Sequence, residues 1–359
     1  MARFGTAVVG GGIFGVTAAV HLARLGHSVV LFERSSGLLS AASNGNQRRM
    51  HRGYHYPRGI ETALSALRSA NDFETEYPSA IDNTRAHYVA ISKRDSLVSA
   101  ERYASFCAKL GLRCREEYPS FLRRSSVEVC LRIDESLIDV DVLRRQCEAS
   151  LAAAGVVVRL REHADREALR NFDHIVLATY ASLNHLLVEL GCRPREYQFE
   201  VCEKPIVTLP SAYQNTSLVI MDGPFMCLDP VAGAQEFLLG NVNHAIWATT
   251  VGDFPLIPNE VLAYLDRGVV RTPAGTHFPE FVGSAHEFLV GFNQARHLGS
   301  IFTTRAVLPD VEATDDRPTL VERIDERIVT IFGGKITTCV EAARVTARTL
   351  SASVAGTTV

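Results

Sequence analysis

The segment that decides the fold is Thr6–Glu33, TAVVGGGIFGVTAAVHLARLGHSVVLFE. Its apolar pattern predicts a buried strand over residues 6–9, a helix with one apolar stripe over 13–25, and a second strand over 28–32. Glu33 ends the second strand. A strand, a glycine-rich turn, a helix, a strand and an acidic residue in this order are typical of a domain that binds a dinucleotide.

Three glycines in this segment, Gly10, Gly12 and Gly15, have the G-x-G-x-x-G spacing, and Glu33 follows 18 residues after Gly15. The first glycine permits the tight turn, the second lets the backbone approach a pyrophosphate, and the third lets helix and strand pack closely. The helix N-terminus offers free N–H groups to phosphates, and Glu33 can accept hydrogen bonds from ribose hydroxyls. The alternative is a tight turn between strand and helix with no ligand.

Length and composition narrow the class of protein. The chain has 359 residues, which predicts two or three domains, and its 47% hydrophobic and 21% charged residues are typical of globular proteins. A net charge of −3 argues against a nucleic-acid partner. Only four of the 37 basic residues are lysines, a bias typical of a GC-rich genome, so we expect a bacterial source.

Cysteine usage and hydropathy indicate the compartment. The eight cysteines form no C-x-x-C pair and no zinc spacing, so we expect free thiols in a reducing cytoplasm and no metal site. The one apolar stretch near the N-terminus, residues 4–20, contains five glycines that the nucleotide fingerprint explains better than export does. We therefore predict a cytoplasmic protein that does not bind membranes.

Later segments repeat the alternation of helix and strand. Residues 139–160 predict a helix, a stop at Gly155 and a strand, and residues 172–179 predict another buried strand. Residues 328–332 predict a last strand, followed by Gly333-Gly334-Lys335 and a helix over 336–350. Three well-separated blocks of this kind predict one α/β domain assembled from discontinuous segments.

Together with the glycine fingerprint, the stretches DESLIDVDVLRRQCEASLAAAGVVV, FDHIVLAT and FGGKITT resemble the D-amino-acid-oxidase superfamily of FAD enzymes. NQRRMHRGYHYPRG, residues 46–59, is similar to a motif of L-2-hydroxyglutarate oxidases, through Asn46, His51, Gly53, Tyr56, Pro57 and Gly59. The end, Gly333–Thr338, is similar to the G-G-K-[LI]-T-T of FAD-dependent glycerol-3-phosphate dehydrogenases.

The resemblance implies an α/β fold, α+β overall, with a discontinuous Rossmann-like FAD-binding domain and a mixed, mostly antiparallel β-sheet substrate domain. We expect the FAD-binding domain at residues 1–75, 139–195 and 300–359, and the substrate domain at 76–138 and 196–299. The expected FAD-binding residues are Gly10, Gly12, Ile13, Phe14, Gly15, Glu33, Arg34, Ser43, Asn46, Gln47, Arg48, Ala178, Thr179, Gly333, Gly334, Lys335, Ile336 and Thr337.

The chemistry needs a proton acceptor, a clamp for an anionic substrate and a group that stabilises the reduced flavin. His51, and after it His55, are the candidate bases. Arg305 is the candidate clamp, preferred over Arg317. Lys335, in a glycine turn that opens a helix, is the candidate for the flavin edge. Three further residues are candidate substrate contacts: Tyr54, Tyr56 and His244.

The stretch 47–58 supplies four arginines and no acid, which indicates an anion-binding surface. Two positions depart from the family pattern. Tyr180 stands where a glycine is usual after Ala178-Thr179, and we expect a different local cofactor contact because tyrosine does not easily take positive φ. His55 replaces an arginine, which argues against glycerol 3-phosphate itself as the substrate.

The leading hypothesis is an FAD-dependent oxidase or dehydrogenase that removes hydride from a CH–OH carbon of a small anionic metabolite. Oxygen or another acceptor would then take up the electrons. Three alternatives stay open: CH–NH oxidation of an amine or amino acid on the same scaffold, a non-redox binding protein of the Rab-escort type, and an NAD-dependent dehydrogenase. The sequence does not indicate the oligomeric state.

Overall fold

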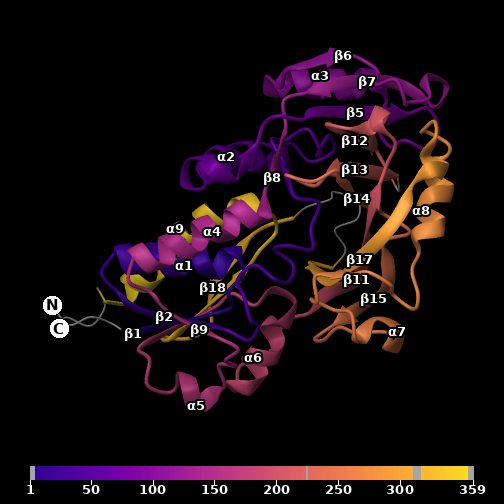
Figure 1. The fold of residues 1–359 in the computed structure, drawn as a ribbon. Helices are drawn as coiled ribbons and strands as arrows, with labels where there is room; N and C mark the ends of the chain where they lie inside the picture. Colours follow the sequence, from indigo (N-terminus) through magenta and orange to yellow (C-terminus); the bar gives the residue numbers. More distant parts are fainter. Residues whose placement is uncertain (1–4, 224, 310–316, 355–359) are drawn as a thin grey trace.

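The computed structural model describes residues 5–223, 225–309 and 317–354, which form two large β-sheets with helices packed on them (Figure 1). The first sheet has six strands. Its neighbouring strands are parallel except for the antiparallel pair at one edge. In spatial order they are β18 (Leu320–Arg323), β19 (Ile328–Phe332), β10 (His174–Leu177), β1 (Gly5–Val9), β2 (Ser28–Glu33) and β9 (Val157–Leu160).

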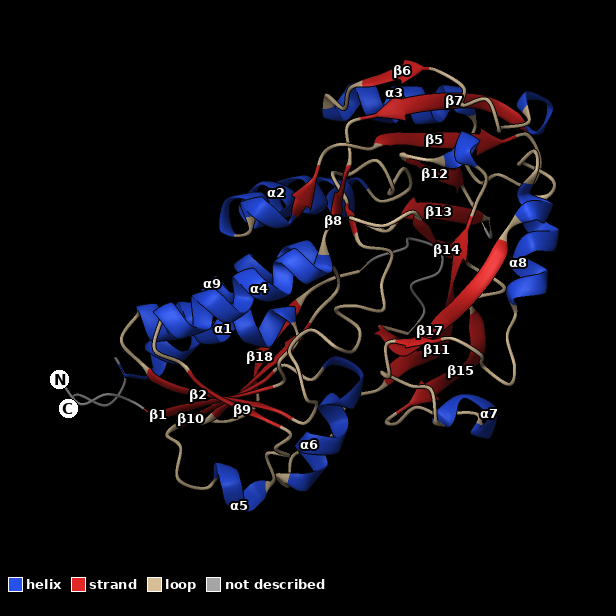
Figure 2. Cartoon of the chain, in the orientation of Figure 1, coloured by secondary structure: helices blue, strands red, loops and turns tan. Residues whose placement is uncertain are grey.

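Helices cover both faces of this sheet, which explains why its strands are apolar on both sides (Figure 2). One face is covered by α1 (Ile13–Arg24), α4 (Val140–Ala153) and α9 (Cys339–Val354), and the other by α5 (Arg166–Leu169) and α6 (Leu183–Glu189). Local signals fix the helix ends. Asp139 caps α4 by accepting hydrogen bonds from the backbone N–H groups of Asp141 and Val142.

The second sheet has ten strands and is mostly antiparallel, with one parallel pair, β5 and β12. In spatial order they are β16 (Val269–Val270), β17 (Arg296–Val307), β11 (Tyr197–Thr208), β14 (Glu236–Asn241), β13 (Met226–Pro230), β12 (Thr216–Met221), β5 (Ala86–Ser92), β7 (Val127–Ile133) and β6 (Cys114–Glu116), and β15 (Ile246–Gly252) pairs with β11.

Helices also cover this second sheet. Residues of α8 (Phe278–Ala285) pack on one face, and residues of α2 (Ile60–Glu76) and α3 (Ala100–Leu110) pack on the other. The short α7 (Asn259–Leu262) lies beside β17 and β11. A small third sheet joins the two halves and contains β3 (Arg49–Met50), β8 (Ser136–Ile138) and β4 (Ile81–Asp82).

This architecture confirms the predicted fold class, a Rossmann-like sheet with a mostly antiparallel second sheet. Two details differ from the prediction. The helix expected from Ile336 begins with a 3₁₀ turn, Ile336–Thr338, and the α-helix starts at Cys339. The predicted boundary at residue 300 falls inside β17, which pairs with β11 along its length. Residues 1–4, 310–316 and 355–359 of the predicted FAD-binding domain lie outside the described residues.

In the described part of the chain, no helix has the length and apolar character needed to span a bilayer. The described residues also contain no group of three or more His, Cys, Asp or Glu side chains placed to hold a metal ion.

Candidate functional site

The first two of the three predicted nucleotide-binding blocks meet at Gly10. This residue has φ +110°, and a Cβ atom at this position would lie 2.5 Å from the carbonyl oxygen of Ala178 and 3.2 Å from Thr179 Cγ2. Gly10 also donates its N–H to Phe32 O at 2.8 Å. Only glycine combines this dihedral angle with such a close approach of backbone. The first glycine turn and the end of β10 therefore form one surface.

The third block reaches the same surface from the end of the chain. A Cβ atom on Gly333 would collide with the ring of Phe14 in the first turn of α1. A Cβ atom on Gly334 would collide with the carbonyl oxygens of Arg317 and Pro318. Segments more than 300 residues apart in the sequence thus touch through glycines whose missing side chains make the contact possible.

Glu33 lies beside the glycine turn, as the fingerprint predicts. Its carboxylate accepts hydrogen bonds from Gly11 N at 2.6 Å and from Ser35 N at 2.7 Å. At the start of α1, Ile13 N donates to Ser43 Oγ at 3.0 Å, so the loop after β2 folds back over the N-terminus of the helix. The helix dipole and the carboxylate are therefore adjacent, as recognition of a phosphate and a ribose requires.

Several polar atoms around this surface are buried and have no hydrogen-bond partner among the described residues. They include Thr179 Oγ1, Thr337 Oγ1 and Arg48 Nε. Buried hydroxyl and guanidinium groups are normally satisfied, so an unsatisfied set points to a polar group that the protein itself does not supply. FAD carries phosphates, ribose hydroxyls and carbonyl groups along its length, and these donors fit it.

Other predicted cofactor residues have different roles. Asn46 uses its side chain within its own loop, donating to Ala42 O and Ser43 O and accepting from Arg48 N. Arg34 is 62% exposed and lies 3.8 Å from Asp266. Gln47 donates to Cys227 Sγ at 2.9 Å, and its Oε1 is buried without a partner. Ile336 packs on the core of the first sheet.

The backbone angle of Tyr180 differs from the one expected. Tyr180 has φ +51°, the left-handed conformation that we expected a tyrosine to avoid. Its hydroxyl donates to Ala306 O at 2.8 Å, and its ring packs 5.8 Å from that of Phe332. These contacts with β17 and β19 stabilise the strained backbone. The turn after β10 therefore has the left-handed conformation that usually requires glycine, with a tyrosine in its place.

A cluster of rings lies next to the C-terminal turn. The rings of His51 and His55 are 4.9 Å apart, and both lie within 5.7 Å of the Tyr56 ring. Lys335 Nζ is 4.1 Å from the centroid of Tyr56. Burial, then His51 and Arg49, lower the pKa of His55 to about 3, so His55 is neutral at neutral pH. The structure therefore brings His51, His55, Tyr56 and Lys335 together.

Behind His51 lies a buried ionic network that sequence reasoning missed. Glu135 Oε1 is 3.6 Å from His51 Nδ1, and the other oxygen of Glu135 is 3.7 Å from Arg49 Nε. Arg49 Nε is also 3.1 Å from Asp229 Oδ1, and Arg49 donates to Ser217 Oγ at 2.6 Å. The Arg49, Glu135 and Asp229 side chains are each at most 2% exposed. Burial raises the pKa of Glu135, but His51 and Arg49 outweigh it and hold the pKa well below the ordinary value.

Most of the basic stretch 47–58 is not an open anion site, contrary to the prediction. Acids from distant segments neutralise three of its four arginines, and Arg48 is the one without an acidic partner among the described residues. Arg49 pairs with Asp229 and Glu135, Arg52 with Glu74, and Arg58 with Asp222, while Arg48 donates to Asn44 Oδ1 at 2.8 Å.

Arg305 also has a partner, because its guanidinium donates to the Glu200 carboxylate across the β11–β17 pair. The Glu200 side chain is 6% exposed. An arginine that is already paired with a buried carboxylate is a poor clamp for an anionic substrate. The competing candidate, Arg317, has its carbonyl group directly against Gly334.

Two predicted substrate contacts lie elsewhere. Tyr54 is 2% exposed in the core beneath α3, where its hydroxyl donates to Arg113 O at 2.6 Å. His244 lies in the turn after β14, where its N–H donates to Asn241 Oδ1 and its ring faces Phe281 of α8. Tyr54 shares a hydrophobic core with Tyr56 but makes no ring contact with His51 or His55 among the described residues, and His244 packs on α8.

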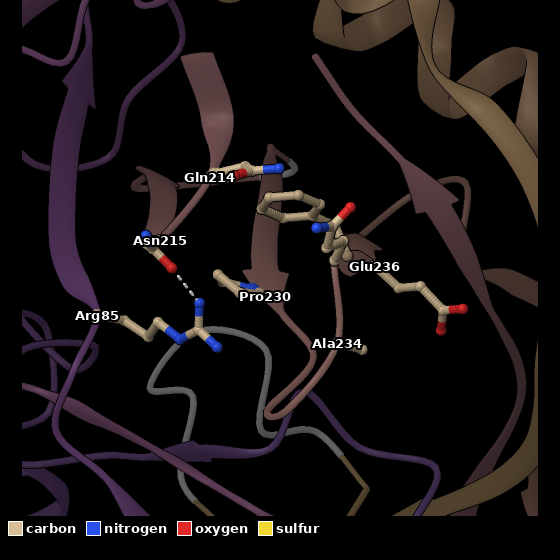
Figure 3. Close-up of a pocket in the computed structure, with 8 residues that line it drawn as sticks. Arg85, Gln214, Asn215, Pro230, Ala234 and Glu236 are labelled. Carbon is tan, nitrogen blue, oxygen red and sulfur yellow. Dashed lines mark hydrogen bonds between the residues drawn. The ribbon is translucent and has the colours of Figure 1, made fainter. Parts of the chain in front are cut away.

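A small pocket on the second sheet is also separate from this cluster (Figure 3). Arg85 donates to Asn215 at its rim. Its lining residues are Arg85, Gln214, Asn215, Pro230, Ala234, Gln235, Glu236 and Phe237. None of the predicted site residues is among them.

The missed residues left weak traces in the sequence. Asp229 is a charged residue inside an otherwise apolar strand, Lys204 directly follows Glu203 in β11, and Glu135 directly precedes β8. A charge inside an apolar strand indicates a buried pair or a ligand contact. The sequence does not identify the partner, because Asp229 lies 180 positions from Arg49.

Comparison with known proteins agrees with this geometry. Residues 6–224 match the DAO family, described as FAD dependent oxidoreductase. The chain is 28% identical over 253 residues to the FAD-dependent monooxygenase FPY4 of Fusarium mangiferae, covering 69% of this chain and 65% of that protein. It is 26% identical to the FAD-dependent monooxygenase kojA of Aspergillus flavus, covering 94% of this chain and 83% of that protein.

A solved structure with the same fold is glycine oxidase from Geobacillus kaustophilus. It has a TM-score of 0.71 and 18% identity, and the match covers 100% of this chain and 96% of that chain. At this identity the likeness shows the fold alone. The curated relatives named above come from fungi, so the predicted bacterial source has no support from them.

Proposed function

Because the chain belongs to the DAO family of FAD-dependent oxidoreductases, we propose that it oxidises the CH–OH carbon of a small anionic metabolite. The predictions of an enzyme and of FAD as its cofactor are confirmed by the family. The two alternatives without FAD chemistry, a non-redox binding protein and an NAD-dependent dehydrogenase, do not fit that family.

FAD, when bound, accepts a hydride equivalent from the substrate and later passes the electrons to an acceptor such as oxygen. The Gly10 and Gly333 turns, the N-terminus of α1 and Glu33 would hold it. Thr179 and Thr337 supply hydroxyl groups that have no other partner among the described residues. Lys335 would place positive charge beside the cofactor, where it stabilises the negative charge of the reduced form.

The observation that carries the proposal is the contact between His51 and Glu135. A hydroxyl group loses its proton only to a base, whereas an amine can react as the neutral free base, so a histidine backed by a carboxylate suits a CH–OH substrate. Glu135 lies 3.6 Å from His51 Nδ1, which leaves Nε2 as the atom that takes the hydroxyl proton. Glu135 thus acts as a positioning residue that holds the ring and offsets its charge.

Within the family, we propose that the chain lies nearest the L-2-hydroxyglutarate oxidase and FAD-dependent glycerol-3-phosphate dehydrogenase branches. The motif around His51 supports the first, and Gly333–Thr338 supports the second. The neutral His55 in place of an arginine argues against glycerol 3-phosphate itself as the substrate.

A second candidate is CH–NH oxidation, which the fold shared with glycine oxidase favours. The test is an anaerobic panel of 2-hydroxy and 2-amino carboxylates with the same carbon skeletons, with loss of the flavin absorption band as the readout. We expect the hydroxy member of each pair to reduce the flavin faster. Faster reduction by the amino members would favour the second candidate. A product that gains an oxygen atom rather than losing two hydrogens would favour a monooxygenase, as the curated relatives are named.

Substitutions test the assigned base. We expect His51→Asn to slow flavin reduction by roughly 10²–10⁴-fold, the range for loss of a general base. Glu135→Gln should lower the rate of reduction while leaving the KM nearly unchanged, since Glu135 acts through His51. Glu74→Gln is the matched control, because Glu74 pairs with Arg52 outside the ring cluster and is 38% exposed. A Glu135→Gln rate equal to that of the control would contradict the assignment.

A further inference from the structure

Lys204 is a half-buried lysine on β11 that the proposed mechanism does not use. Side chains alternate along a strand, so Lys204 shares its face with Cys202 and Glu200, while Glu203 points to the other face. Glu203 is fully buried there and is satisfied by Trp247, His277 and Ser300. Lys204 has no hydrogen-bond or ion-pair partner in the described part of the chain.

The face that carries Lys204 is the one that meets the loop after β2. Ile301 of β17 is the cross-strand neighbour of Lys204, and a Cβ atom on Gly45 would lie 3.5 Å from Ile301 Cγ2. On its other side, β11 pairs with β14, where Ile206 lies opposite Leu238. Continued by two residues, this antiparallel register places Gly240 beside Lys204. Gly240 has no Cβ, and the amide of Gln47 covers it. Lys204 therefore lies under the segment that connects the glycine fingerprint to the His51 cluster.

The other cations on this face already have carboxylate partners. Arg305 pairs with Glu200, and Arg49 pairs with Asp229 and Glu135. The ionisable groups that act on Lys204 are the Cys202 and Cys227 thiols, Arg305 and Asp229, whose carboxylate is engaged by Arg49 and Ser217. Burial lowers the pKa of Lys204, the expected result for an ammonium group without a direct counter-ion.

Gln47 adds a second unsatisfied group beside this lysine. Its Oε1 is buried without a partner, while its Nε2 contacts Cys227, one of the residues that act on Lys204. An unpaired ammonium and an unpaired amide oxygen on adjacent elements are costly unless a ligand satisfies them. A carboxylate would satisfy the ammonium, whereas the amide oxygen only accepts hydrogen bonds and needs a donor, such as a hydroxyl group on the same ligand. One ammonium matches the single charge of a carboxylate. A phosphate is more often held by several cations or by the fork of an arginine.

We propose that Lys204 binds the carboxylate of the substrate, so that this half-buried lysine, and not Arg305, sets the preference for small carboxylic acids. That the bound carboxylate belongs to the substrate rests on the proposed function, but the anion can bind without turnover. It assigns Arg305 to the internal pair with Glu200.

The test measures binding of acetate to the oxidised FAD-bound protein by the change in flavin absorption. Acetamide, which has the same shape and no charge, is the reference ligand. We expect Lys204→Met to weaken acetate binding by roughly 10–100-fold, the range for loss of one hydrogen bond to a charged group. Acetamide binding should stay unchanged. Lys204→Arg should retain most of the affinity, and Lys93→Met, at an exposed lysine, should retain all of it.

Thermal unfolding separates this role from a structural one. Removing an unpaired, half-buried charge stabilises a protein, so Lys204→Met should bind FAD normally and unfold at a higher temperature than the wild type. Lys204→Gln serves as the second variant if the methionine packs poorly. Loss of bound FAD in both variants would make Lys204 structural and overturn the proposal.

Three further results would also overturn it. These are unchanged acetate binding in Lys204→Met, a larger loss in Arg305→Met than in Lys204→Met, and binding of inorganic phosphate in preference to acetate. Failure of the proposed function gives a different pattern. If no 2-hydroxy carboxylate reduces the flavin while acetate binding still depends on Lys204, the anion site is supported and the proposed CH–OH reaction is contradicted.

Discussion

The two sheets of this protein bury different kinds of side chain. The core around the six-stranded sheet is apolar, and its buried polar residues are mainly threonines. In the described part of the chain, all the buried carboxylates lie in or beside the ten-stranded sheet. They are Glu135, Glu200, Glu203, Asp222 and Asp229.

This difference reflects two ways of building a ligand site. Beside the first sheet, recognition uses backbone shape, glycines without side chains and a helix N-terminus, all provided by short stretches of sequence. Beside the second sheet, recognition uses charges that must find partners from remote segments, as Arg49 finds Asp229. Substitutions near the first sheet should therefore act through shape, and substitutions near the second through uncompensated charge.

The largest expected effect is at Gly10. In Gly10→Ala, the new Cβ would meet the carbonyl oxygen of Ala178 at 2.5 Å in a conformation with positive φ. We expect loss of bound FAD, measured as flavin absorption per mole of purified protein. Gly26→Ala is the matched control, since Gly26 also has positive φ but no atom within 4 Å. It should cost about 1 kcal/mol of stability and retain FAD. Retention of FAD by Gly10→Ala would contradict a site built on shape.

The next effect tests the buried charges. Arg49→Met leaves Glu135 and Asp229 buried without their cation, and loss of one partner of such a network costs about 3–5 kcal/mol. The measurement is the free energy of unfolding in urea. Arg52→Met is the control, because the Arg52–Glu74 pair is 21% and 38% exposed and should contribute less than about 1 kcal/mol.

A combined variant sharpens this result. Replacing Arg49, Glu135 and Asp229 together by Met, Gln and Asn removes all three charges, so it should be more stable than Arg49→Met alone. Equal or lower stability of the triple variant would mean that packing of the Arg49 side chain, and not its charge, supports this region.

The same contrast explains how far the sequence predicts the structure. The strand over 328–332, the strand and helix around the fingerprint, and the helix that begins near residue 139 follow from local periodicity and turn chemistry, and the structure has them. The proximity of Gly333 and Phe14 could be expected, because both belong to motifs predicted to bind the same FAD molecule. Local sequence signals were sufficient to predict the parts of the site that are formed by the backbone.

The charge pairs were not predictable in this way. The stretch 47–58 contains no acid, and nothing local shows that Glu74, Asp222 and Asp229 come to neutralise it. The Arg305 prediction failed to foresee Glu200 for the same reason, since the two lie on paired strands 105 residues apart. Tyr180 shows a related limit, because contacts with β17 and β19 stabilise a backbone angle that residue preference alone disfavours.

A smaller effect is expected from an ion pair between α1 and the end of α2, on the face of the first sheet that α1 covers. Glu76 at the end of α2 accepts from Arg24 and lies 3.5 Å from His21 on α1. The close contact with His21, opposed by burial and aided by Arg24, lowers the pKa of Glu76 to about 2 from 4.5. The folded state thus gains stability that is present above pH 4.5 and lost as the pH falls toward 2. Glu76→Gln should lose about 1–2 kcal/mol at pH 7 and much less at pH 3. An equal loss at both values would contradict this assignment.

The smallest effect has the opposite sign and occurs at Lys204. Because the pKa of Lys204 is lowered in the folded state, the unfolded chain binds its proton more strongly, and stability rises with pH until the ordinary value of 10.5 is passed. The gain in melting temperature from Lys204→Met should therefore shrink as the pH is raised from 7 toward 10.5. Lys109→Met, at an exposed lysine on α3, should show no such trend. A pH-independent gain would mean that the methionine packs better than the lysine stem. The cost of an unpaired charge, which we expect to distinguish the second sheet from the first, would then be absent at this position.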